Sequence, residues 1–63
     1  MNEYNCQYQC EHSIWHTYAC VYDLSSALSA HNDAVMDDPH MNFRIIVITD
    51  NVVTEYYAQT VQE

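Results

Sequence analysis

Five thiol and imidazole side chains stand close together near the start of the chain, in the segment YNCQYQCEHSIWHTYACVY. They are Cys6, Cys10, His12, His16 and Cys20. Thiolates and imidazoles are the usual ligands of zinc, and a cysteine beside a histidine can act as a nucleophile with its base. The secondary structure decides between these chemistries, because a helix would gather the five side chains on one stripe and a strand would divide them between two faces.

The order of residues between positions 4 and 22 favours strands. Every second residue from Tyr4 to Tyr22 is aromatic, aliphatic, a thiol or an imidazole, and the first intervening positions are polar. We predict two antiparallel strands, at about residues 3–10 and 14–22, joined by a turn at His12 and Ser13. A helix over the same stretch is the alternative, although aromatic residues and cysteines favour helices less.

The turn at His12 and Ser13 divides the side chains of this first hairpin. The face toward the rest of the protein is expected to carry Tyr4, Cys6, Tyr8 and Cys10 opposite Val21, Ala19, Thr17 and Trp15, and the outer face Ile14, His16, Tyr18, Cys20 and Tyr22. This register cannot bring the three thiols to one point, so we expect no metal site and interpret the buried thiols as small hydrophobic side chains. His16 and Cys20, two apart on one strand, do not form a shielded nucleophile and base, so we expect no catalytic site, no cofactor and no enzyme.

The following segment, DLSSALSAHNDAVMDDP, changes to helical spacing. Asp23 can cap the first turn, and Pro39 prevents continuation. Residues 42–59 then predict a second hairpin with Asp50 and Asn51 as its turn, since both tolerate a left-handed backbone. That turn would set Phe43, Ile45 and Val47 beside Thr54, Tyr56 and Ala58 on one face, and Arg44, Ile46 and Ile48 with Val53, Glu55 and Tyr57 on the other. The sequence therefore predicts a single α+β domain, 1–63, in which one helix packs on one face of a four-stranded antiparallel sheet, in the order β-β-α-β-β.

The charge balance of the chain is one-sided. Nine acidic residues stand against one Lys or Arg side chain, Arg44, and the formal net charge is −8. Direct binding of nucleic acid or of an anionic membrane is disfavoured, and an electrostatic partner should be basic. The longest apolar run, residues 45–48, is far too short to span a bilayer. Three cysteines cannot pair completely and no apolar signal segment is present, so we expect free thiols in the cytoplasm.

The alternating first hairpin, the helix entry YDLSSALSA and the hairpin segment IIVITDNVV resemble the small β-β-α-β-β proteins of phages and mobile elements. The acidity and the absence of lysine are similar to those of anti-CRISPR proteins and other phage inhibitors that imitate DNA. The resemblance covers the whole chain and rests on pattern and charge. It implies a protein of an infected or host bacterial cell that blocks the nucleic-acid-binding site of a host defence complex.

Six acidic residues are the candidate partner-binding surface on this interpretation: Asp33, Asp37, Asp38, Glu3, Glu11 and Glu55. Asp33 and Asp37 lie one helical turn apart, about 6 Å, on the exposed helix face. A solvated acidic face that only keeps the protein in solution is the alternative. Ile14, Tyr18 and Tyr22 would form a second interface on the uncovered sheet face, suited to a homodimer or to a structural adaptor. A metal-binding module is the third class.

Overall fold

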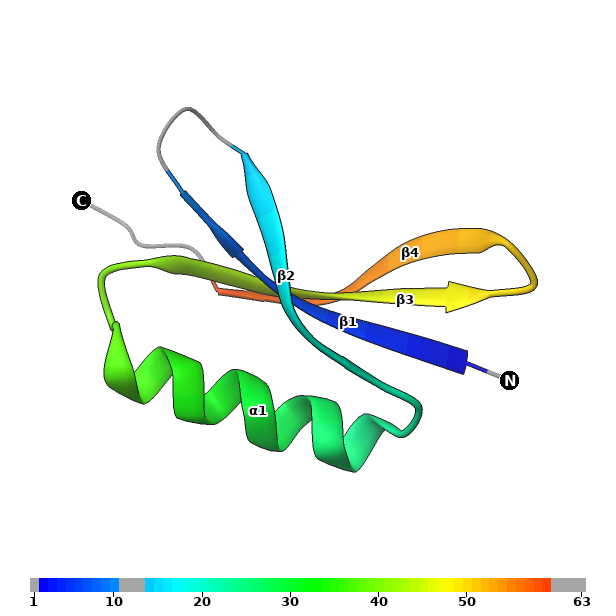
Figure 1. Cartoon of the computed structure of the whole chain (residues 1–63), viewed down its shortest axis with the longest axis horizontal. Helices are drawn as coiled ribbons and strands as arrows, with labels where there is room; N and C mark the ends of the chain where they lie inside the picture. Colours follow the sequence, from blue (N-terminus) through cyan, green and yellow to red (C-terminus); the bar gives the residue numbers. More distant parts are fainter. Residues whose placement is uncertain (1, 11–13, 60–63) are drawn as a thin grey trace.

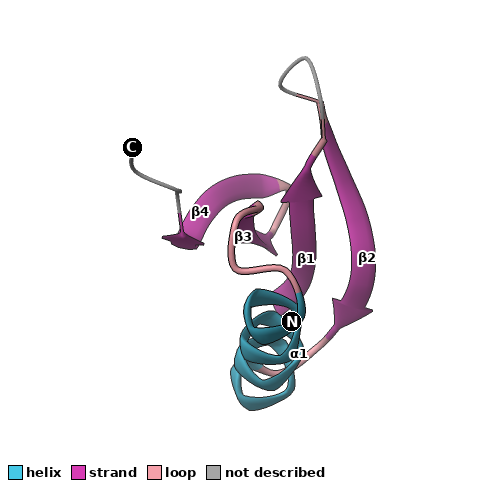
Figure 2. Ribbon diagram, turned by 90° about the vertical axis from the view of Figure 1, so that its left-hand side faces the viewer, coloured by secondary structure: helices cyan, strands magenta, loops and turns pink. Residues whose placement is uncertain are grey.

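The computed structural model describes residues 2–10 and 14–59, with side chains up to Tyr56. Strands β1 (Asn2–Gln9) and β2 (Trp15–Val21) precede helix α1 (Leu24–Asp37), and strands β3 (Asn42–Thr49) and β4 (Val52–Gln59) follow it. The strands form one antiparallel sheet in the order β2-β1-β3-β4. The predicted element order and fold class are confirmed. Figures 1 and 2 show α1 along one side of the twisted sheet, with β4 curling away from the helix.

Helix α1 begins and ends where its flanking residues predict. Asp23 has an extended backbone, and its Oδ2 accepts a hydrogen bond from the Ser26 N–H at 2.8 Å. This bond satisfies one of the amides that the first turn leaves without a helical partner. At the other end the Asp38 N–H donates to the Ala34 carbonyl at 3.0 Å, and Pro39 follows. The helix is too short to cross a membrane, and no helix in the described part of the chain qualifies.

The core lies where α1 packs on β1, β2 and β3. Cys6, Ala27 and Ile45 are fully buried there, and the Cys6 thiol donates to the Ala27 carbonyl at 3.5 Å. Small side chains at positions 6 and 27 let the helix backbone approach the sheet closely. His31 is also fully buried, and its ring meets the edge of Phe43 at 6.1 Å between centroids. We call the sheet surface under α1 the helix face and the opposite surface the open face.

The turn between β3 and β4 has the predicted conformation. Asp50 and Asn51 have φ angles of 50° and 67°, the left-handed values that a two-residue hairpin turn of this kind needs at both positions. Thr49 therefore lies opposite Val52, and Glu55 lies opposite Ile46, as predicted. Beyond this point the predicted register is wrong. Ile45 lies opposite Tyr57 instead of Tyr56, because a β-bulge at Tyr56 adds one residue to β4.

A second bulge changes the faces of β2. Cys6 lies opposite Ala19 as predicted, but Gln7 lies opposite Thr17, so that Tyr18 is the extra residue. The predicted inward positions of Thr17 and Trp15 are therefore wrong, and both residues belong to the open face. His16 and Tyr18, predicted on the outer face, lie on the helix face. Because residues 14–22 alternate without a break, their pattern carries no signal of the bulge.

Candidate functional site

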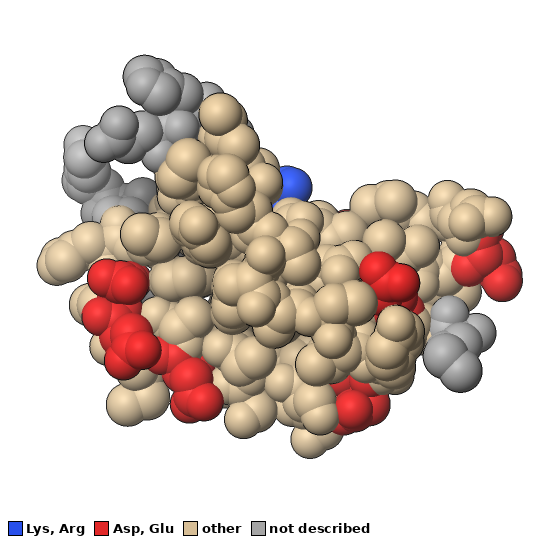
Figure 3. All heavy atoms as spheres, viewed as in Figure 1, with Lys and Arg blue, Asp and Glu red and all other residues tan. Residues whose placement is uncertain are grey.

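Three carboxylates mark the C-terminal end of α1. Asp33, Asp37 and Asp38 are exposed, and Figure 3 shows acidic atoms gathering over this end of the helix. The carbonyl end of a helix carries a partial negative charge, which adds to theirs. Among the side chains that the structure describes, the one ion pair joins Arg44 to Glu55, on the open face. This end of α1 is therefore a concentrated negative surface.

A pocket of about 300 Å³ opens beside these carboxylates, between α1 and the helix face of the sheet. Phe43 lines it and is only 3% exposed, while Tyr18 remains 37% exposed. Tyr8 adds a third ring, and Asp37 and Asp38 line the pocket from the end of the helix. A pocket of this size is at the lower end of the range for ligand sites, about 300–1,000 Å³. It combines aromatic surface with negative charge.

The aromatic rings that line the pocket pack against one another. The ring centroid of Tyr18 lies 6.2 Å from that of Tyr8 and 6.3 Å from that of Phe43, and the rings of Tyr18 and Phe43 meet edge to face at 78°. Tyr8 in turn stacks on His16, with 5.3 Å between the ring centroids. Burial, and then the nearby Cys6 thiol, raise the pKa of Tyr18 to about 12. Tyr18 therefore stays a neutral phenol at physiological pH, and the bulge that turned it inward built one wall of the pocket.

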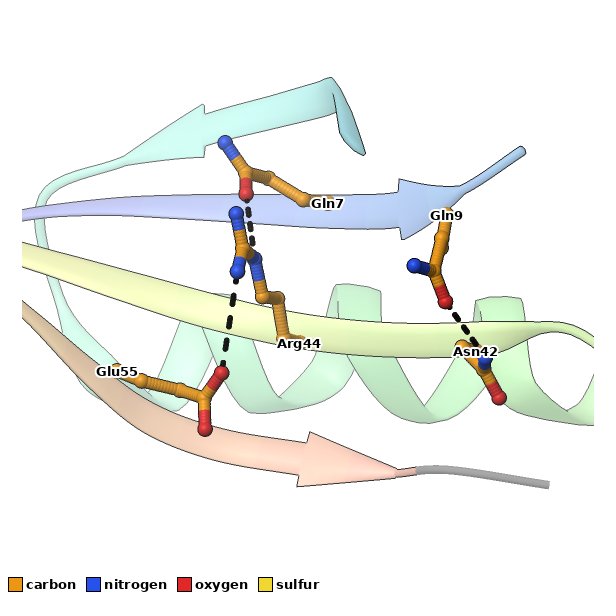
Figure 4. Close-up of polar contacts among 5 residues, drawn as sticks. All are labelled: Gln7, Gln9, Asn42, Arg44 and Glu55. Atoms are coloured by element: carbon orange, nitrogen blue, oxygen red, sulfur yellow. Dashed lines mark hydrogen bonds and ion pairs between the residues drawn. The ribbon is translucent and has the colours of Figure 1, made fainter. Parts of the chain in front are cut away.

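The only Lys or Arg side chain of the sequence lies on the open face. The Arg44 Nε donates to the Gln7 Oε1 at 2.8 Å, its Nη1 lies 3.9 Å from the Glu55 Oε2, and its Cζ lies 4.1 Å from the centre of the Trp15 ring. Figure 4 shows the Arg44 side chain across β1, β3 and β4, with α1 behind the sheet. A further polar contact, from Asn42 Nδ2 to Gln9 Oε1 at 2.7 Å, lies along the same strands. A guanidinium, a carboxylate and an aromatic ring thus meet on this surface.

The remaining acidic residues of the predicted surface do not join the end of α1. Glu3 is half-buried on the open face and accepts a hydrogen bond from the Asn5 Nδ2 at 3.0 Å. Glu55 faces Arg44 there, and Glu11 lies outside the described residues. Of the six carboxylates, the structure brings together the three on α1 and places Glu3 and Glu55 on the opposite side of the sheet.

The predicted second interface does not form one patch. Ile14 and Tyr22 are 51% and 62% exposed, but they flank opposite ends of β2, roughly 25 Å apart at about 3.3 Å per residue. Tyr18 contacts Phe43 on the helix face, so its predicted place on the uncovered face is wrong. Exposed apolar side chains gather instead on the edge strand β4, at Val52, Val53 and Tyr56, a feature that sequence analysis missed.

The predicted division of the thiols is confirmed for Cys6 and Cys20, and Cys10 is less buried than expected. Cys6 is buried and Cys20 exposed, whereas Cys10, expected inside, is only half-buried. Its Sγ lies 3.2 Å from the His16 Nε2, so His16 meets Cys10 and not Cys20. Burial raises the pKa of the Cys6 thiol and makes it a poor nucleophile. Within residues 2–10 and 14–59 no group of three His, Cys, Asp or Glu side chains is arranged to hold a metal ion.

Comparison with protein-family models, curated proteins and solved structures found no match to this chain. The most distinctive arrangement is the end of α1, where exposed carboxylates stand beside an aromatic pocket. Carboxylates and aromatic faces both attract cations, so this site is suited to a positively charged partner.

Proposed function

We propose that the protein is a non-enzymatic inhibitor that binds a basic nucleic-acid-binding protein and keeps nucleic acid out of its groove. The observation that carries the proposal is the exposed acidic end of α1, in a chain of net charge −8. Arg44, the one Lys or Arg side chain, is held on the opposite face of the sheet by Gln7, Trp15 and Glu55 and does not reduce the charge of the helix end.

The physical basis is charge imitation. Duplex DNA carries one negative charge per roughly 1.7 Å of its axis, and the proteins that bind it line their grooves with Lys and Arg. The Cβ atoms of Asp33 and Asp37 lie one helical turn apart, about 6 Å, and Asp38 follows directly as the C-cap residue. The net charge of −8 would also speed the encounter with a basic surface by electrostatic steering.

The resemblance to phage inhibitors suggests the class of partner, a host defence complex of the CRISPR type. We place the encounter in the bacterial cytoplasm. No disulfide joins Cys6, Cys10 and Cys20, which all lie among the described residues, and this fits a reducing compartment. No chemistry on the nucleic acid is required, because occupancy of the groove is sufficient for inhibition.

A second candidate function is a structural adaptor or homodimer that uses the edge strand β4. Val52, Val53 and Tyr56 are each more than half exposed, and among the described strands β4 pairs with β3 alone. An exposed apolar edge can accept a further strand from another chain. If the protein is an adaptor or homodimer that uses β4, replacing Val53 by Thr and Tyr56 by Gln should abolish partner binding. If it is an inhibitor that binds through the end of α1, the same replacements should leave partner binding intact.

The test is a displacement assay with purified CRISPR effector complexes from several types, each bound to fluorescently labelled target DNA. We expect the protein to release DNA from at least one complex. Fluorescence anisotropy would give the inhibition constant, which should rise steeply with salt because exposed charges are screened over about 10 Å at 0.1 M. Failure to release DNA from any complex at low salt would contradict the inhibitor proposal.

Two charge-matched variants locate the surface. Asp33→Asn/Asp37→Asn/Asp38→Asn and Glu3→Gln/Asp50→Asn/Glu55→Gln each remove three carboxylates and change the net charge from −8 to −5. The helix variant should inhibit at least about tenfold more weakly, which corresponds to about 1.4 kcal/mol. The second variant should lose much less. Equal losses would show that total charge matters and that the end of α1 is not the binding surface.

A further inference from the structure

The open face shows how this protein holds a guanidinium group. Arg44 lies with its Cζ 4.1 Å from the centre of the Trp15 ring, beside a carboxylate of Glu55 and an amide oxygen of Gln7. The aromatic face attracts the cation, and the oxygens accept its N–H groups. A ring and a carboxylate around one planar cation are the essential parts of this arrangement.

The helix face holds the same parts around an open pocket. Tyr8, Tyr18 and Phe43 supply rings, and Asp37 and Asp38 supply carboxylates. The chain has no second Lys or Arg to occupy it, because Arg44 is the only one in the sequence. We infer that this pocket receives an arginine side chain of the basic partner. The inference rests on the proposed function for the origin of that arginine and adds a defined anchoring site to it.

The chemistry of the pocket suits arginine better than lysine. A guanidinium is planar and can lie against a tyrosine ring while its N–H groups reach two carboxylate oxygens, whereas an ammonium is a compact, strongly hydrated charge. The volume of about 300 Å³ is sufficient for one side chain, and Asp37 and Asp38 would repel a ligand that carries phosphates. Phe43, almost fully buried, gives the methylene groups of the entering chain an apolar surface.

The test uses the isolated protein and three small probes, the N-acetyl N-methylamides of arginine, lysine and norleucine. Titrations followed by two-dimensional NMR should show saturable shifts for the arginine probe at Tyr8, Tyr18, Phe43 and Ala34. We expect millimolar affinity, because a single side chain makes few contacts. Equal affinity for the norleucine probe would show a merely apolar pocket, and equal affinity for the lysine probe would show recognition of charge without shape. Either result would overturn the inference.

Matched variants separate the pocket from the overall charge. Asp37→Asn/Asp38→Asn removes two carboxylates that line the pocket, and Asp33→Asn/Asp50→Asn removes two that do not, so that both variants have a net charge of −6. The first should bind the arginine probe about tenfold more weakly, which corresponds to about 1.4 kcal/mol, and the second should bind it like the parent. The first should also stay folded, because negative charge at a helix C-terminus opposes the dipole. Equal affinities of the two variants would contradict the proposed site.

The ring of Tyr18 is tested by Tyr18→Phe and Tyr18→Leu. Both keep an apolar side chain, so NMR spectra can confirm the fold, but only the phenylalanine keeps an aromatic face. We expect Tyr18→Phe to retain the arginine probe and Tyr18→Leu to lose most of its affinity. Retention by both would overturn the role of the ring.

These results and the displacement assay can fail separately. If the protein releases DNA from an effector but the arginine probe does not shift pocket resonances, the anchoring site is wrong and the inhibitor proposal stands. If the probe binds in the pocket but no effector loses its DNA, the site stands and the proposed target class is wrong. The displacement assay and the NMR titration can both be carried out on the same 63-residue protein.

Discussion

The two faces of the sheet combine similar residue types with different results. On the open face, Arg44 fills the space between the Trp15 ring and Glu55, and the charges offset one another. On the helix face, the rings of Tyr8 and Tyr18 stand beside carboxylates of α1, and the chain provides no Lys or Arg there. The first arrangement stabilises the protein. The second leaves negative charge and aromatic surface available to a partner.

This comparison shows how a very acidic chain can use its only Lys or Arg. With nine acidic residues and one such cation, internal pairing cannot neutralise the molecule. Arg44 lies on the inner strand β3 and contacts Gln7 on β1, Trp15 on β2 and Glu55 on β4, so it links all four strands on the side of the sheet away from α1. Because Arg44 lies on the other face of the sheet, it does not offset the negative charge at the end of α1.

The largest expected effect concerns the buried core on the helix face of the sheet. Phe43→Ala removes a ring that is 3% exposed and packs against both Tyr18 and His31, so it should reduce the free energy of unfolding by about 3–5 kcal/mol. Urea denaturation followed by circular dichroism measures this loss. Val53→Ala, on β4 with a side chain 63% exposed, is the control and should change stability by no more than about 0.5 kcal/mol. Similar losses at both positions would contradict the described core.

The next largest effect is a pH dependence of the free energy of unfolding, which originates at the buried His31 on the helix side of the sheet. Burial lowers the pKa of His31 below its ordinary value of 6.5. The unfolded chain therefore takes up a proton near pH 6.5 while the folded protein does not, so the free energy of unfolding should fall as the pH drops below 6.5 toward the folded pKa. One such group contributes at most about 1.4 kcal/mol per pH unit.

Urea titrations between pH 7.5 and 5.5 would measure this slope, and His31→Leu is the variant that tests its origin. Leucine keeps an apolar side chain under Phe43 and cannot be protonated, so the slope of this variant should be shallower than that of the parent. An unchanged slope would assign the pH dependence to other groups and would count against a neutral, buried His31.

The smallest effect tests the open face. Arg44→Gln removes the cation next to Trp15 and Glu55 and should cost about 1 kcal/mol, because the cation–π contact contributes about 0.5–1 kcal/mol and the part-exposed ion pair less. DNA displacement should be unaffected, since Arg44 lies on the other side of the sheet from α1. Arg44→Lys keeps the charge without the planar group, so a variant as stable as the parent would show that shape is unimportant there.

Much of the fold followed from local patterns. The alternation of residues 4–22 predicted strands, Asp23 and Pro39 predicted the ends of α1, and Asp50 with Asn51 predicted the turn between β3 and β4. Each signal acts within a few residues, through a hydrogen bond, a missing N–H group or an allowed backbone angle. The exposed aspartates of α1 were predictable for the same reason, because helical spacing alone sets their face.

The candidate site could not be predicted in the same way. Tyr18 reaches the pocket, and Trp15 reaches Arg44, only because β2 contains a bulge between two stretches of regular pairing. A one-residue shift moves every later side chain of a strand to the other face, and an alternation that continues through the bulge does not reveal it. The composition of the chain determined its charge, and local patterns determined its elements. Tertiary packing alone decided which aromatic rings stand beside the carboxylates of α1 and which hold Arg44.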